Sequence, residues 1–80
     1  MRVYYDDEYR TLIACLKDLR ESKGMTQTQL AEILGKGQSY VSKYEQCQRR
    51  LDVLEVRKIC VSLGTSLPDL VKEFESRLNS

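Results

Sequence analysis

The side chains best suited to chemistry in this chain lie close together, between positions 38 and 50. Gln38, Ser39, Ser42 and Lys43 all carry hydrogen-bonding groups within one short segment. A glutamine can contact adenine through two hydrogen bonds, a lysine donates to guanine, and a serine hydroxyl donates or accepts. If the segment is a helix, these four side chains share its outer face, because its apolar residues turn inward. The pattern indicates a surface that reads base edges; an ordinary solvated helix face is the simpler alternative.

Residues 26–45 must position that face, and they are typical of two short helices joined by a tight turn. Ala31 offers a small side chain where two steeply crossed helices meet, and Gly35 suits a left-handed turn. Such a helix-turn-helix places its second helix in the major groove of DNA. Apolar residues recur at helical spacing within each half and predict one buried face. The residues expected to be buried are Leu30, Ile33, Leu34, Val41 and Tyr44.

Capping residues and glycines divide the chain into five predicted helices. A polar cap satisfies free backbone amides at a helix start, and a glycine just past the last turn ends a helix. The third helix is the exception, because Gly37 offers no side-chain acceptor at its start. No segment alternates at the period of a strand, so the fold is predicted to be all-α. Thr26 with Gln29 marks the start of the second helix, Asp52 with Glu55 that of the fourth, and Ser66 that of the fifth. The first helix is predicted over 7–23 and ends at Gly24, and the fourth is predicted to run to about 63, before Gly64.

The apolar stripe of the first helix is expected to consist of Leu12, Leu16 and Leu19, flanked by Tyr9, Ile13 and Cys15. Tyr4 and Tyr5 are expected to cover an edge of the core, with a contact surface as the alternative.

Length and charge fit one small nucleic-acid-binding domain. The 80 residues predict a single domain over 1–80, with its core within 9–78. Net charge is only +1, but residues 36–58 hold six basic residues against three acidic ones, whereas residues 1–9 are acidic. A basic patch of this kind suits phosphate binding.

The composition gives little support to catalysis or metal binding. The three cysteines include no Cys-x-x-Cys pair, and the chain has no histidine to complete a zinc site. Free thiols in a reducing cytoplasm are the expected state of Cys15, Cys47 and Cys60. Without a nucleophile–base motif or a phosphate-cradling glycine loop, no enzyme activity, catalytic residue, metal or cofactor is predicted. No signal peptide or membrane span is predicted either, which favours a cytoplasmic location.

Residues 12–74 resemble the phage repressor/Cro-type, or XRE-like, helix-turn-helix DNA-binding family. The resemblance implies a compact five-helix repressor-like domain, with the helix-turn-helix at 26–45. It rests on Leu-Lys-Asp-Leu-Arg at 16–20, Lys-Gly-Met-Thr-Gln at 23–27, Leu-Ala at 30–31, Gly35, Gln-Ser-Tyr-Val-Ser-Lys-Tyr-Glu at 38–45, Arg-Arg at 49–50 and Leu-Gly at 63–64.

The resemblance assigns roles to the polar residues. Gln38 and Ser39 match the first base-reading positions, and Ser42 and Lys43 match positions that reach deeper into the groove. Cys47 stands where the family often has glycine. The residues that we expect to contact phosphate are Gln27, Tyr40, Gln46, Arg49 and Arg50, although the two arginines could serve solubility alone.

Two further expectations concern assembly and support of the site. Arg20 and Glu45 match a largely buried salt bridge between the first and third helices; two separate surface charges are the alternative. Phe74 and Leu78 are expected at a homodimer interface, because little of the chain remains to cover Leu78; a monomer with a frayed last turn is the alternative. The sequence therefore predicts a transcriptional regulator that reads a palindromic double-stranded DNA operator as a homodimer. The rival is an antitoxin or adaptor whose main partner is a protein.

Overall fold

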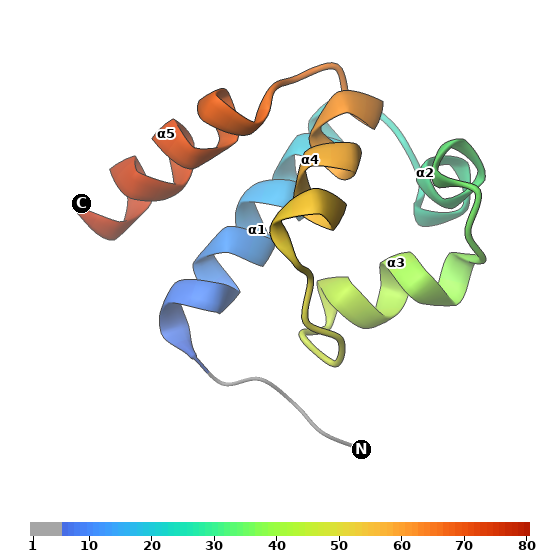
Figure 1. Cartoon of the computed structure of the whole chain (residues 1–80), viewed down its shortest axis with the longest axis horizontal. Helices are drawn as coiled ribbons and strands as arrows, with labels where there is room; N and C mark the ends of the chain where they lie inside the picture. The colour runs from blue at the N-terminus through green and yellow to red at the C-terminus, as the bar shows by residue number, and fades with distance from the viewer. Residues whose placement is uncertain (1–5) are drawn as a thin grey trace.

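A computed structural model describes residues 6–80, so the expectation for Tyr4 and Tyr5 lies outside the described residues. Within that range the fold is all-α, as predicted. The helix-turn-helix and α5 lie on opposite sides of α1 and α4 (Figure 1). The helices are α1 (Asp7–Ser22), α2 (Gln27–Leu34), α3 (Gln38–Glu45), α4 (Val53–Ser62) and α5 (Leu67–Leu78).

The predicted caps begin the helices. Thr26 Oγ1 accepts the backbone N–H of Gln29 at 3.0 Å, and the Gln29 side chain returns a bond to Thr26 N at 2.8 Å. Asp52 and Glu55 form the same reciprocal capping box before α4. Gly37 begins α3 without a side-chain cap, as its lack of a side chain requires.

The turn between α2 and α3 depends on Gly35. Its φ of 70° lies in the left-handed region, which residues with a Cβ adopt only with steric strain. In this conformation Gly35 N–H bonds to the Glu32 carbonyl, and Lys36 N–H bonds to the Ala31 carbonyl. These bonds satisfy carbonyls in the last turn of α2, and the chain then turns toward α3.

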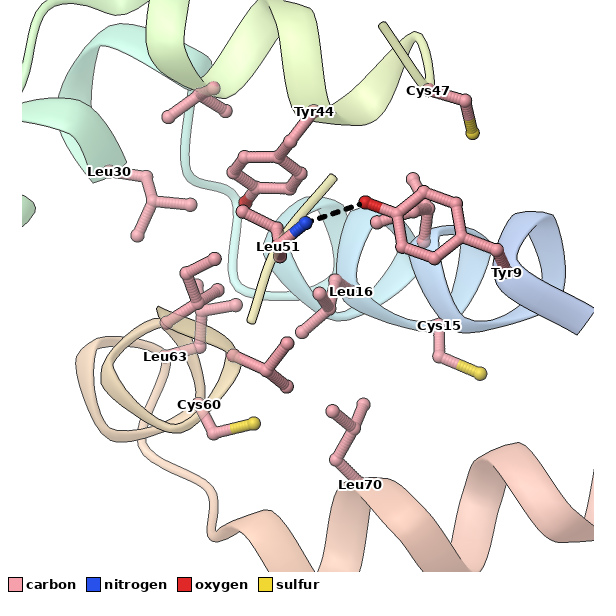
Figure 2. Packing of buried hydrophobic residues seen from close by; sticks show 14 of the residues in the cluster. Tyr9, Cys15, Leu16, Leu30, Tyr44, Cys47, Leu51, Cys60, Leu63 and Leu70 are labelled. Atoms are coloured by element: carbon pink, nitrogen blue, oxygen red, sulfur yellow. Dashed lines mark hydrogen bonds between the residues drawn. The ribbon is translucent and has the colours of Figure 1, made fainter. Parts of the chain in front are cut away.

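The core forms where α1 meets the other helices, and Figure 2 shows its side chains. Leu16 of α1 is fully buried, and so is Leu30 of α2. The predicted stripe of α1 needs a correction, because Leu12 and Leu19 are only partly buried whereas Tyr9 and Ile13 are 6% and 2% exposed. The buried face therefore runs through the residues predicted to flank it.

The prediction that Ile33 is buried is wrong, because its side chain is 56% exposed. The neighbours of the short helix α2 cover Leu30 and Ala31 on one face. Ile33 lies at the edge of that face and lines a shallow surface hollow together with Val61 of α4.

Cys15, Cys47 and Cys60 are buried free thiols. No helix in the range 6–80 combines the length and apolar content that crossing a bilayer requires.

Candidate nucleic-acid interface

Helix α3 turns a polar face to solvent. Gln38, Ser39 and Lys43 are exposed and Ser42 is half-buried, while the apolar residues Val41 and Tyr44 of the same helix are fully buried. The structure thus brings the four predicted base-reading side chains to one helix that lies at the edge of the molecule (Figure 1). Ser42 Oγ accepts from Gln46 Nε2 at 2.8 Å, which links the end of this face to the loop that follows.

A continuous chain of hydrogen bonds connects the interior to the first residue of α3. Arg20 of α1 donates from Nε to Glu45 Oε2 at 2.7 Å and from Nη2 to Glu45 Oε1 at 3.1 Å. Gln27 Nε2 donates to the same Glu45 Oε1 at 2.9 Å. Gln38 Nε2 then donates to Gln27 Oε1 at 2.7 Å. Gln27 therefore connects Gln38 to the buried Arg20–Glu45 ion pair, and this connection orients the Gln38 side chain.

The Arg20–Glu45 pair is almost withdrawn from solvent, with side chains that are 9% and 3% exposed. Arg20 Nη1 also donates to the carbonyl of Met25, just before α2. Its hydrogen bond to Glu45 raises the pKa of Arg20 further above its already high ordinary value. One guanidinium thus joins α1, α3 and the segment that leads into the helix-turn-helix.

Helix α3 ends with Cys47 in the left-handed region, at φ 58°. Cys47 N–H bonds to the Tyr44 carbonyl at 3.0 Å, and Gln48 N–H bonds to the Lys43 carbonyl at 2.8 Å. This pair of bonds is the Schellman motif, whose left-handed position is usually glycine. Cys47 therefore keeps the loop shape expected of the family glycine, with a buried thiol in place of a hydrogen.

Glu55 of α4 joins two residues of the predicted phosphate-contacting set. Tyr40 Oη donates to Glu55 Oε2 at 2.8 Å, and Arg49 Nη2 donates to the same oxygen at 2.6 Å. The Arg49 guanidinium also lies over the Tyr40 ring, 5.0 Å from its centroid. The Arg49 side chain remains 44% exposed, so it keeps surface for a phosphate. The Tyr40 hydroxyl, in contrast, already has a partner within the chain, and its contact with phosphate stays a prediction.

The ionisation of this cluster is fixed across the ordinary pH range. Burial raises the pKa of Glu55, but hydrogen bonds from the Asp52 backbone, Arg49 and Tyr40 outweigh burial and hold that pKa at about 2. Burial, followed by the bond to Glu55, raises the pKa of Tyr40 to about 12. The carboxylate stays charged and the tyrosine stays neutral near pH 7.

Two contributors to the loop were missed by sequence reasoning. Sequence spacing predicts only a capping role for Glu55 and only a flanking place on α1 for Tyr9, yet Arg50 lies over the Tyr9 ring with its Cζ 4.6 Å from the centroid. Their aromatic or acidic character is a weak signal, because Tyr9 contacts a loop about 40 positions away and Glu55 contacts Tyr40, 15 positions away. Within residues 6–80, no three His, Cys, Asp or Glu side chains gather as ligands for a metal ion.

Within residues 6–80, five helices that include a helix-turn-helix, an exposed polar second helix and a basic loop are typical of one class of protein, the DNA-binding transcriptional regulators. A helix-turn-helix family model matches residues 16–70. The solved structure of an XRE-family like protein from Pseudomonas syringae pv. tomato is 38% identical, covers 91% of this chain and 89% of its own, and gives a TM-score of 0.85. The chain belongs to the XRE-type helix-turn-helix family.

Other solved structures are similar as well. The clp gene regulator ClgR from C. glutamicum is 28% identical over 86% of this chain and 88% of its own, with a TM-score of 0.77. The restriction-modification controller protein C.Esp1396I is 23% identical over 91% of this chain and 96% of its own, with a TM-score of 0.84, and shows the fold alone. No curated protein matches the chain.

Proposed function

We propose that the protein regulates transcription by reading a palindromic operator in double-stranded DNA as a homodimer. The observation that carries the proposal is the exposed polar face of α3, whose first residue, Gln38, is held by Gln27 and the buried Arg20–Glu45 pair. A reading side chain that is fixed before binding loses less conformational freedom when it meets a base.

In this proposal α3 enters the major groove and two sets of contacts divide the work. Gln38, Ser39, Ser42 and Lys43 contact base edges and give specificity. Phosphate contacts fix the position of the protein on the duplex and make its affinity dependent on salt. We assign those contacts to Gln27, Tyr40, Gln46, Arg49 and Arg50.

Variants of α3 and the loop separate the two sets. Lys43→Ala and Gln38→Ala should each weaken operator binding by about 1–3 kcal/mol and relax preference at one base pair. Arg49→Ala should instead weaken all sequences similarly and reduce the salt slope by about 1. Lys17→Ala is the matched control, because it removes the same charge from an exposed position of α1. A Lys43→Ala variant with unchanged affinity and preference would show that the reading face is wrongly assigned.

An apolar groove supports the homodimer. Phe74 of α5 is half-buried in this groove, between α4 and α5, with Val53 and Val71 at 62% and 44% exposed. Leu78 is half-buried one turn beyond Phe74. A two-fold dimer through this side of the fold would place its two copies of α3 about 34 Å apart, one turn of DNA, and so require a palindromic site.

Sedimentation tests the dimer. Leu78→Asp and Val71→Asp should dissociate it without loss of helicity, because each places a charge in the proposed interface. Val61→Asp is the control, since Val61 is 57% exposed on α4 but lies outside the groove. Detection of only a 9.3 kDa species, with and without DNA, would contradict the homodimer and leave DNA binding intact.

A protein-binding adaptor or antitoxin is the second candidate. The hollow that Ile33, Leu34 and Val61 share would suit an apolar side chain of a partner. The salt dependence of DNA binding separates the two functions: a steep dependence favours the DNA reader, and a flat one favours the adaptor.

A further inference from the structure

Tyr9, in the first turn of α1, connects the start of α1 to the loop at residues 46–52. Its hydroxyl donates to the Arg49 carbonyl at 2.9 Å and accepts the Leu51 N–H at 3.1 Å; Figure 2 shows the second bond. Tyr9 precedes Arg49 by 40 positions in the chain. It is buried, with only 6% of its surface exposed. One buried hydroxyl therefore holds the loop backbone on both sides of Arg50.

The same tyrosine also supports the Arg50 side chain. The guanidinium carbon lies 4.6 Å from the centroid of the Tyr9 ring, within the range of a cation–π contact. Arg50 as a whole is nevertheless exposed, so the contact orients the guanidinium without burying it. An arginine that is restrained in this way loses less rotamer freedom when it binds a phosphate.

The loop needs such support between its two ends. The Schellman motif of α3 reaches as far as Gln48, and the capping box of α4 begins at Asp52. The residues between them include both loop arginines, and Tyr9 bonds to the backbone there. Burial raises the pKa of Tyr9, so its hydroxyl keeps the proton that it donates.

We propose that Tyr9 is a positioning residue for DNA binding, which holds Arg50 and the loop backbone in the orientation that a phosphate contact requires. The proposal rests on the proposed function, because Arg50 is its phosphate-binding group. A tyrosine that served the core alone would affect the stability of the fold and leave the ionic contacts of the folded protein unchanged. The salt dependence of DNA binding distinguishes these roles, because its slope counts phosphate contacts.

The experiment measures affinity for a mixed-sequence DNA duplex over a range of salt concentrations. The proteins are wild type, Tyr9→Phe, Tyr9→Leu, Arg50→Ala and the double variant Tyr9→Leu/Arg50→Ala. Tyr9→Phe keeps the ring beneath Arg50 and removes the hydroxyl, whereas Tyr9→Leu removes both. Ile13→Val is the control for stability, because it trims a residue of α1 that is 2% exposed. All measurements are made where each variant is folded by circular dichroism.

The proposal predicts that Tyr9→Leu lowers the salt slope by about 1, as Arg50→Ala does, and that the double variant loses no more than either single one. Tyr9→Phe should weaken binding of the mixed-sequence duplex with a smaller loss of slope, and Ile13→Val should change neither. If Tyr9→Leu does not fold, the Tyr9→Phe result decides.

Two results would overturn the proposal, and they differ in what they say of the proposed function. Wild-type slope and affinity in the Tyr9 variants, together with a reduced slope in Arg50→Ala, would reject positioning by Tyr9 and retain the phosphate contact. An unchanged slope in Arg50→Ala would reject both, because Tyr9 would then have no phosphate-binding group to position.

Discussion

Removal of the Glu45 carboxylate is expected to destabilise this fold strongly. Glu45→Ala takes away the acceptor of three hydrogen bonds, two from Arg20 and one from Gln27. Arg20 would keep its bond to the Met25 carbonyl, but its charge would have no counterion at a side chain that is 9% exposed.

Breaking a buried ion pair by removing one partner costs about 3–5 kcal/mol, most of it the penalty of an uncompensated charge. Native proteins are stable by about 5–15 kcal/mol in total, so Glu45→Ala should remove from about a fifth to all of the stability of this fold. The Glu73–Arg77 pair on α5 is the matched control, because its side chains are 57% and 33% exposed. Glu73→Ala should cost about 1 kcal/mol or less, since exposed pairs contribute little.

Urea unfolding followed by circular dichroism measures both variants. A double variant, Arg20→Met/Glu45→Leu, should lose less stability than Glu45→Ala, because it removes the charge together with its partner. The reasoning would be refuted if Glu45→Ala unfolded with a free energy within about 1 kcal/mol of wild type, as an exposed pair would.

Three further predictions follow from single residues. The pKa of Glu55 is about 2 in the folded protein against an ordinary 4.5, so its contribution to stability is complete above pH 4.5 and is lost as the pH falls to 2. Glu55→Gln should therefore flatten the plot of urea midpoint against pH between these values, and parallel curves for wild type and variant would contradict this. Tyr44→Phe should keep or raise the unfolding free energy by about 1 kcal/mol, because the buried Tyr44 hydroxyl has no hydrogen-bond partner among residues 6–80, and a clear loss would show that it has one. Gly35→Ala should cost about 1–2 kcal/mol through its φ of 70° alone, because a Cβ there meets no atom within 4 Å; Gly37→Ala is the control, and equal costs would reject backbone strain as the cause.

Local signals were enough to predict the helices. A capping box acts within four residues, so Thr26 and Asp52 could be recognised as helix starts from sequence spacing alone. The left-handed turn after α2 was equally local, because Gly35 is the residue that adopts it without strain.

Contacts between distant residues were beyond such reasoning. Tyr9 is bonded to a loop 40 residues away, and Glu55 of α4 accepts hydrogen bonds from Tyr40 of α3 and from Arg49 of the loop. Neither contact has a fixed spacing along the chain. The prediction that Ile33 is buried was wrong for a related reason. Helical periodicity places Ile33 near the apolar face of α2, but the helices packed against α2 determine where that face ends.

The claim that α3 recognises DNA bases is tested most directly by selecting bound duplexes from a random DNA pool. The selection is run in parallel with wild type and Lys43→Ala. Wild type should select a two-fold symmetric sequence. Lys43→Ala should lose preference at one base pair of each half-site and keep the rest, because Lys43 lies on the exposed face of α3 and the fold does not depend on it. Identical profiles for the two proteins, or no preference with wild type, would contradict the claim that α3 reads the operator.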